Sequence, residues 1–160
     1  MTEVPVLIVG GGPVGLTASI LLSRLGVGSR LVERHPGTAF HPKARNINMR
    51  TMEVFPQCGV EDAIRAAGVG LDRTVFLIFA ESLAGREIER RQPRRANTRG
   101  DDSPSAVGHC LCAQDDLEPV LRRCAESLAP GTLAFGTELV RFEQDADGVT
   151  ATVRGPGGEE

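Results

Sequence analysis

Three glycines and one carboxylate have the types and spacing needed to bind a dinucleotide. Gly10, Gly12 and Gly15 form the pattern G-x-G-x-x-G directly after a short apolar run, and Glu33 follows about twenty residues later. In such a pattern, backbone N–H groups at the start of a helix bind a pyrophosphate, and the carboxylate accepts hydrogen bonds from a ribose. These residues therefore predict recognition of an adenine dinucleotide.

Each position of the glycine pattern has its own predicted role. Gly10 permits the tight turn out of a strand, and Gly12 has no Cβ, so phosphate can approach the backbone. Gly15 allows the helix to pack closely on the sheet. Pro13 and Val14 lie in the first helical turn, where N–H groups have no intrahelical partner. We expect all five residues to form the cofactor-binding turn.

Glu33 narrows the choice of dinucleotide. A carboxylate at this position would repel a 2′-phosphate, which disfavours NADP and leaves FAD or NAD. The alternative is a glycine-rich strand-to-helix turn in a domain that binds no ligand. The sequence context favours the binding turn, because the pattern lies inside a strand–helix–strand unit.

The elements that must position these residues follow from hydrophobic patterning. Residues 4–9 read as a buried strand, residues 13–25 as a helix that stops at Gly26, and residues 30–33 as a second strand. Two helices, at 48–55 and 60–67, follow a loop rich in proline. The remaining predicted elements are strands at 74–80 and 86–89, a polar loop at 96–105, a helix at 114–128, a strand at 133–135, and a hairpin of strands 139–144 and 149–153. This order predicts an α/β fold, a Rossmann-type βαβ unit with a parallel sheet and an antiparallel β excursion.

Composition excludes several classes of protein. The 160 residues carry a net charge of −3, which gives no general attraction to nucleic acid or to an anionic membrane. No apolar run is long enough to span a bilayer, and the amino terminus lacks a signal peptide, so we expect a cytoplasmic protein. The four cysteines and three histidines have no metal-site spacing, and we expect reduced, partly buried thiols and no metal.

Positive charge is concentrated in an arginine-rich segment, residues 85–99. The simplest interpretation is a solvated strand edge and loop. The alternative is a surface that attracts an anionic ligand or a partner chain.

Three stretches of the chain resemble one enzyme family. They are "VLIVGGGPVGLTASILLSRLGV", "LVERHPG" and "HPKARNINMRTMEVFPQCGV", and "CAQDDLEPVLRRCAE" adds a fourth. The sequence is similar to the amino-terminal part of the flavin-dependent aromatic hydroxylases, the single-component flavoprotein monooxygenases of the para-hydroxybenzoate hydroxylase type. It is most similar to members that hydroxylate aromatic polyketides. The third stretch is the most specific, because an NAD dehydrogenase has no reason to carry it.

The resemblance implies FAD as the cofactor and a role for five further side chains. Glu33 would hold the adenosine ribose, and Arg34 would lie along the adenine. Lys43 or Arg45 would contact the pyrophosphate, with no basis for choosing between them. Gln114 would hydrogen-bond the ribityl chain or a phosphate. Taken without the resemblance, these side chains other than Glu33 read as a surface salt bridge, solvated loop charges and a helix cap.

The resemblance also implies an incomplete enzyme. Family members are more than twice as long, and two further flavin-contacting motifs, Asp-Gly and Gly-Asp, normally follow; Asp147-Gly148 reads only as a hairpin turn. We expect residues 1–70 to form the dinucleotide-binding part, 71–108 to begin the substrate domain, and 109–160 to return to the FAD-binding domain. The chain would then be a truncated product, a fragment or half of a split enzyme, completed by a complementary carboxyl-terminal chain or a homo-oligomer.

The activity implied by the resemblance is hydroxylation of a phenolic or polyketide ring with NADPH or NADH and oxygen. The cofactor supplies the difficult chemistry, so no residue is assigned as a catalytic acid, base or nucleophile. One rival is an NAD-dependent dehydrogenase, and the other is a non-catalytic module that binds a nucleotide or partner through the arginine-rich segment.

Overall fold

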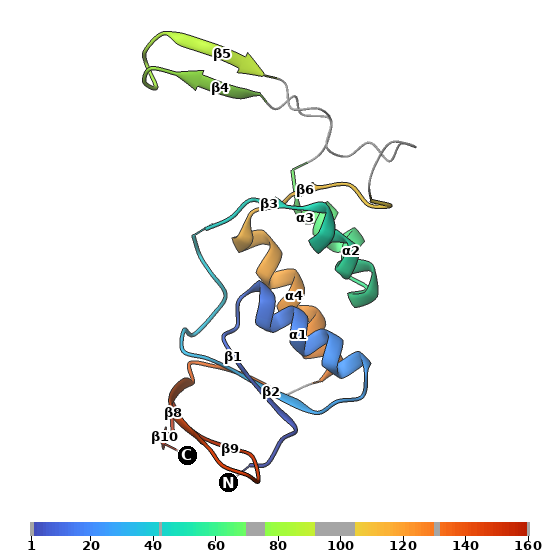
Figure 1. Ribbon diagram of the computed structural model, residues 1–160, viewed down its shortest axis with the longest axis vertical. Coiled ribbons are helices and arrows are strands. Elements are labelled where there is room, and N and C mark those ends of the chain that lie inside the picture. The colour runs from blue at the N-terminus through green and yellow to red at the C-terminus, as the bar shows by residue number, and fades with distance from the viewer. Residues whose placement is uncertain (1, 42, 70–75, 92–104, 130–131, 160) are drawn as a thin grey trace.

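The computed structural model describes residues 2–41, 43–69, 76–91, 105–129 and 132–159. It is an α/β protein in which a helical layer and an antiparallel hairpin sheet lie on opposite sides of a small parallel sheet (Figure 1). The elements in chain order are β1 (Val6–Val9), α1 (Pro13–Arg24), β2 (Ser29–Glu33), β3 (Asn46–Ile47), α2 (Met49–Cys58), α3 (Glu61–Ala67), β4 (Leu77–Ala80), β5 (Glu87–Arg91), β6 (Cys110–Leu111), α4 (Gln114–Leu128), β7 (Leu133–Phe135), β8 (Glu138–Gln144), β9 (Val149–Gly155) and β10 (Gly158–Glu159). The predicted α/β class with parallel and antiparallel strands is confirmed.

The parallel sheet has the order β1-β2-β7, so β2 is central. Val6 to Val9 pair in register with Ser29 to Val32, and Leu31 then pairs with Leu133 on the other side. These strands are short and rich in β-branched residues, as expected for a parallel sheet covered by helices. The carboxyl ends of β1 and β2 therefore lie next to each other. β1 leads into the glycine turn, and β2 ends at Glu33.

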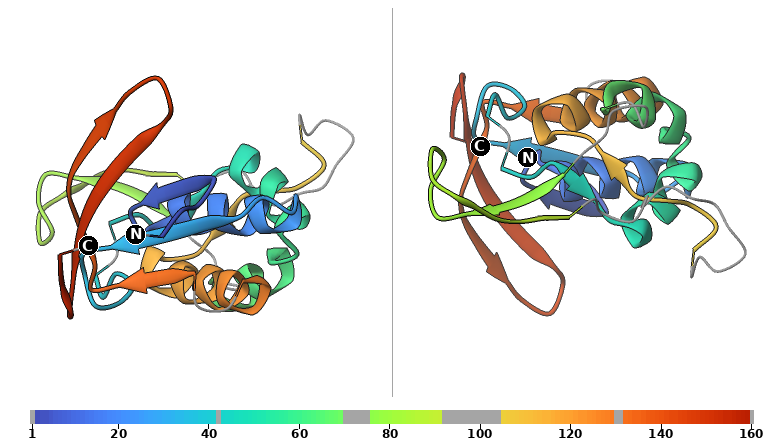
Figure 2. Two further views of the ribbon diagram at one scale, coloured as in Figure 1. Left: turned by 90° about the horizontal axis from the view of Figure 1, so that it is seen from below. Right: turned by 90° about the horizontal axis from the view of Figure 1, so that it is seen from above.

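The core lies between this sheet and the helices. α1 and α4 pack against each other and against α2 and α3, as Figure 2 shows from two sides. Their apolar faces meet at helical spacing, for example through Leu16 and Ile20 of α1 and Leu121 of α4, all fully buried. Gly59, in the left-handed conformation at φ 69°, ends α2 after Cys58 instead of at the predicted Phe55.

The structure has two short pairings that the sequence did not predict. β3 pairs with β6 in antiparallel fashion, so that Ile47 lies beside Cys110. β10 adds a third strand to the predicted hairpin of β8 and β9. The strands β3, β6 and β10 have two residues each, which is too short for a periodic hydrophobic pattern.

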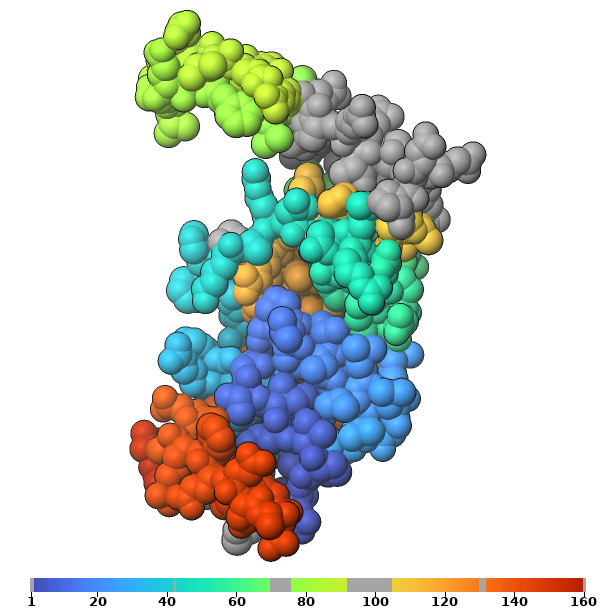
Figure 3. Space-filling view, viewed as in Figure 1, coloured from blue at the N-terminus to red at the C-terminus, as the bar shows by residue number. Residues whose placement is uncertain are grey.

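The predicted antiparallel excursion is the hairpin of β4 and β5, which projects away from the rest of the described chain (Figures 1 and 3). All of its residues are exposed, including Leu77, Ile78 and Phe79. Its arginines are paired with acids of the same hairpin, and Arg90 and Arg91 also lie over phenylalanine rings. A two-stranded sheet with both faces exposed is marginal alone, so this hairpin needs further packing. The predicted polar loop and the later arginines of the arginine-rich segment fall largely outside the described residues.

All four cysteines are free thiols, and three of them are buried. Burial raises the pKa of the Cys112 thiol to about 11 and also raises the pKa of Cys58, Cys110 and Cys124. Because the thiolate is the reactive form, these thiols are poor nucleophiles at neutral pH. None of the helices in the described part of the chain has the length and apolar character that crossing a bilayer requires.

The thiols give a first testable prediction. In the native protein we expect a disulfide reagent such as DTNB to modify no more than one thiol per chain quickly, at the partly exposed Cys124, and all four after denaturation. Cys124→Ser should remove the fast phase and leave the slow one. Rapid modification of two or more thiols in the folded protein would contradict the burial of Cys58, Cys110 and Cys112.

Candidate dinucleotide-binding cleft

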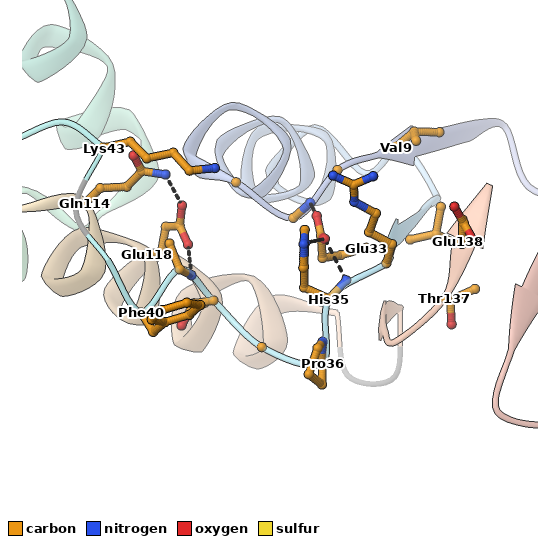
Figure 4. Close-up of a pocket in the computed structure, with 18 of the residues that line it drawn as sticks. Val9, Glu33, His35, Pro36, Phe40, Lys43, Gln114, Glu118, Thr137 and Glu138 are labelled. Carbon is orange, nitrogen blue, oxygen red and sulfur yellow. Dashed lines mark hydrogen bonds and ion pairs between the residues drawn. The ribbon is translucent and has the colours of Figure 1, made fainter.

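A cleft of about 930 Å³ opens where β1 and β2 end (Figure 4). This is the edge of a parallel sheet at which open α/β folds bind their ligands. One end is formed by the turn into β8, with Thr137 and Glu138, and the other by Lys43 and by Gln114 at the start of α4. Of the ten predicted cofactor-binding residues, the cleft is lined by Gly10, Gly12, Glu33, Arg34, Lys43 and Gln114.

The glycine turn has the geometry that its spacing predicts. Gly10 has φ 108°, a conformation that a side chain would strain. A Cβ on Gly15 would lie 1.9 Å from the carbonyl oxygen of Gly10, so α1 approaches the turn as closely as a glycine allows. A Cβ on Gly12 would have only the Glu118 carboxylate within 4 Å, at 3.9 Å. Gly15 is therefore needed for packing, whereas Gly12 keeps the cleft open.

Four of the predicted residues do not line the cleft, and each has a local reason. Gly15 faces the turn against which it packs. Val14 is 84% exposed, because it lies about 200° around the helix from the buried Leu16. Pro13 has no N–H to offer, and Arg45 is exposed where the chain enters β3. The side chains of these residues are thus not placed to contact a ligand in the cleft.

Gly11 is a residue that the sequence reasoning missed. Its N–H donates to Glu33 Oε2 at 2.7 Å. A Cβ on Gly11 would lie 2.9 Å from Glu33 Cβ and 3.1 Å from the Phe135 ring. The available signal was a glycine at position 11, which the G-x-G-x-x-G fingerprint leaves open to any residue.

Glu33 ends β2 with its carboxylate at the cleft wall. Oε1 accepts the His35 backbone N–H at 2.8 Å and lies 2.6 Å from His35 Nδ1, and Oε2 accepts from Gly11. Burial alone would raise the pKa of Glu33, but the hydrogen bonds from His35 and Gly11 outweigh it and lower the pKa below 4.5. The carboxylate is therefore ionised at neutral pH, with lone pairs left to accept a hydroxyl.

The positive end of α1 is available to an anion in this cleft. Its N-cap, Gly12, has extended backbone and makes no side-chain capping bond. The first-turn N–H groups of a helix lack intrahelical partners and carry the positive end of the helix dipole. Lys43 extends its amine from the opposite side toward the turn after β1 (Figure 4). The cleft thus offers N–H donors and the Lys43 amine to a phosphate group.

Gln114 and Glu118 occupy the same side of α4, one turn apart. Gln114 Nε2 donates to Glu118 Oε1 at 2.6 Å, and the Ala39 N–H donates to Glu118 Oε2 at 2.6 Å. Glu118 is 2% exposed, and the sequence reasoning did not identify it. Its spacing from the buried Leu121 and Ala125 placed it on the core face of the helix, which was a usable signal.

The cleft fits an adenine dinucleotide on its own geometry. The space over Gly12 is open, Glu33 lines the cleft beside it, and no described side chain fills the hollow between them. The lining extends from Thr137 at one end to Gln114 at the other, which suits an extended ligand with its phosphates near the middle. The arrangement binds and orients a ligand, and it contains no nucleophile paired with a base.

Comparison with known families agrees with this geometry. A family model described as "FAD binding domain" matches residues 3–160. A putative polyketide hydroxylase of Streptomyces coelicolor is 48% identical over 154 residues, which cover 95% of this chain and 24% of that protein. The chain therefore spans about a quarter of the length of this relative.

Solved structures give the same result. The flavin-dependent monooxygenase PieE, solved with FAD and substrate, superposes with a TM-score of 0.82 at 40% identity, over 95% of this chain and 27% of that one. An aklavinone-11 hydroxylase, solved with FAD and aklavinone, gives a TM-score of 0.81 at 34% identity, over 100% of this chain and 31% of that one.

Proposed function

The chain belongs to the FAD-binding domain family, and from this premise we propose that it forms the adenosine and pyrophosphate part of the FAD site of an aromatic hydroxylase. The observation that supports the proposal most directly is the contact of Gly11 N–H with Glu33 at 2.7 Å, beside the uncapped amino terminus of α1. This contact supports the proposal because the candidate ribose acceptor, Glu33, and the candidate phosphate cradle at the start of α1 then lie in one cleft. The bound group is FAD.

We propose that different residues of the cleft bind different parts of FAD. Glu33 accepts the adenosine ribose hydroxyls, and Arg34 lies along the adenine. The amides at the start of α1 bind the pyrophosphate, with Lys43 as the nearer of the two candidate cations. Lysine gives a point charge where arginine would give a two-pronged contact, so the phosphate is held mainly by the backbone.

Gln114 serves the ribityl chain in this proposal. One N–H of its amide donates to Glu118, so its carbonyl oxygen and its second N–H remain for the ligand. A carbonyl oxygen accepts from a hydroxyl and does not bond a phosphate oxygen. Because Glu118 fixes the amide so that this acceptor remains for the ligand, we propose a ribityl hydroxyl as the partner of the Gln114 carbonyl oxygen.

A bound flavin would accept hydride from NADPH or NADH and would activate oxygen for transfer to an electron-rich aromatic ring. The residues of this chain contribute binding, orientation and exclusion of water from the nucleotide end of the cofactor. We propose a phenolic or polyketide substrate, bound largely by parts of the protein that lie outside this chain.

The domain organisation follows as a proposal. Residues 1–70 and 109–160 build the FAD-binding domain, and residues 71–108 begin the substrate domain. The exposed apolar side chains of β4 and β5 support this division, because they need a covering surface that the described chain does not offer. That surface would come from the rest of the enzyme, from a complementary carboxyl-terminal chain or from a second copy of the protein.

An absorption spectrum of the purified protein, with chromatography of what it releases on denaturation, tests the proposal. We expect flavin bands and release of FAD, or uptake of FAD on titration when the protein is purified without cofactor. Bound NAD without flavin would favour a dehydrogenase instead. Binding of a partner that salt alone releases, with no flavin uptake, would favour the non-catalytic module.

A further inference from the structure

Glu118 is a buried carboxylate with two donors from different parts of the chain. One donor is the backbone N–H of Ala39, 79 residues away in sequence and part of the connection that borders the cleft. The other is the side-chain amide of Gln114, one turn earlier on the same helix. Each donor meets a different oxygen, both at 2.6 Å (Figure 4). Glu118 therefore ties the loop to α4 and also fixes the Gln114 amide.

Only a carboxylate can do both tasks with this geometry. It accepts on both oxygens, whereas a glutamine at the same position would accept on one atom and donate from the other. A glutamine would then set its own N–H₂ group against either Ala39 N–H or the Gln114 amide nitrogen. The Gln114 amide would have to rotate, which would present its N–H₂ group to the cleft in place of its carbonyl oxygen.

The position of this charge is unfavourable unless it has a structural purpose. Glu118 Oε1 is the one heavy atom within 4 Å of the point that a Cβ on Gly12 would occupy, beside the predicted phosphate cradle. A carboxylate next to a phosphate repels it, and burial adds a desolvation cost. A residue chosen only for packing at this place on the core face would be apolar.

We propose that Glu118 is a positioning residue of the cofactor cleft. It holds the loop through Ala39 against α4 and presents the Gln114 carbonyl oxygen as the acceptor for a ribityl hydroxyl. The inference rests on the proposed function in that the ligand is FAD. It assigns no contact between Glu118 and the ligand itself.

An exchange of the two side chains tests the proposal. The single variants are Glu118→Gln and Gln114→Glu, and the double variant E118Q/Q114E restores one carboxylate and one amide with reversed roles. Glu126→Gln, on a partly exposed ion pair of the same helix, is the matched control for loss of charge. The measurements are FAD affinity by titration, hydrogen exchange of the Ala39 amide without FAD, and thermal unfolding.

We expect each single variant to weaken FAD binding about 10-fold or more and the double variant to recover most of the loss. Exchange at Ala39 should accelerate in Glu118→Ala, which removes both acceptors, and should stay near wild type in E118Q/Q114E. The control should change neither quantity. A residue with a purely structural role would change unfolding without any recovery of FAD affinity in the double variant.

Two results would overturn the proposal. One is unchanged FAD affinity in Glu118→Gln and Glu118→Ala, and the other is a double variant no better than the worse single variant. If the wild-type protein takes up no FAD, the proposed function fails. The Ala39 exchange comparison still tests the positioning role in that case, because it needs no ligand.

Discussion

Gly15→Ala should lower the free energy of unfolding by at least about 3 kcal/mol and abolish detectable FAD binding. The added Cβ would lie 1.9 Å from the Gly10 carbonyl oxygen and 3.3 Å from Ile8 Cγ2. The close contact is with backbone, so no side-chain rotation can relieve it, and α1 must move away from the turn. Thermal or denaturant unfolding followed by circular dichroism measures the first effect, and FAD titration measures the second.

Gly12→Ala is the matched comparison, and it should weaken FAD binding without lowering stability. Its Cβ would meet only the Glu118 carboxylate at 3.9 Å, so folding should be unchanged within about 1 kcal/mol. If the pyrophosphate approaches the backbone at Gly12 as we propose, the same Cβ would obstruct it, so FAD affinity should fall. If Gly15→Ala proves as stable as wild type, or Gly12→Ala binds FAD normally, the assignment of the two glycines is wrong.

Glu33→Gln should weaken FAD binding about 100-fold. A glutamine keeps the shape of the side chain but replaces one acceptor with a donor, which would face the N–H of either Gly11 or His35. It also removes the charge that strengthens hydrogen bonds from the ribose. Titration with FAD measures the effect, and Glu143→Gln, on an exposed strand remote from the cleft lining, is the control.

The same substitution has a predicted pH dependence. The pKa of Glu33 is lower in the folded protein, so its contribution to stability is present above its ordinary pKa of 4.5 and is lost as the pH falls through the folded pKa. The difference in unfolding free energy between wild type and Glu33→Gln should be constant from about pH 6 upward and shrink below pH 4.5. A difference that instead grows in acid would show that the hydrogen bonds to Gly11 and His35 do not favour the ionised carboxylate.

Much of the fold could be predicted because its signals are local. The glycine turn, the buried strand before it and the helix from Gln114 to Leu128 each depend on propensity and periodicity within a short window, and the structure has that helix with the predicted bounds. The β3–β6 pair could not be predicted, because two-residue strands separated by 62 residues have no periodicity of their own. A pairing of this kind depends on the tertiary arrangement that brings the two segments together.

The residues of the site also fall into those that the sequence could predict and those that it could not. Gly10, Gly12, Gly15 and Glu33 were identifiable because a phosphate and a ribose demand particular residue types at fixed spacing in one chain segment. Which basic side chain enters the cleft was not, since Lys43 and Arg45 have the same sequence context and differ only in where the loop turns before β3. The roles of Gly11 and Glu118 depend on contacts with residues 22 and 79 positions away.

The sequence by itself determined the fold class, the binding turn and the class of ligand, because each follows from residue type and short-range spacing. Only the tertiary structure decided which side chains meet. It brought the Glu33 carboxylate to the Gly11 N–H, placed Lys43 in the cleft lining, and set the buried Glu118 carboxylate between the loop and α4. Hydrogen bonds and packing between distant segments depend on how the chain returns in space, and nothing in the local sequence specifies that return.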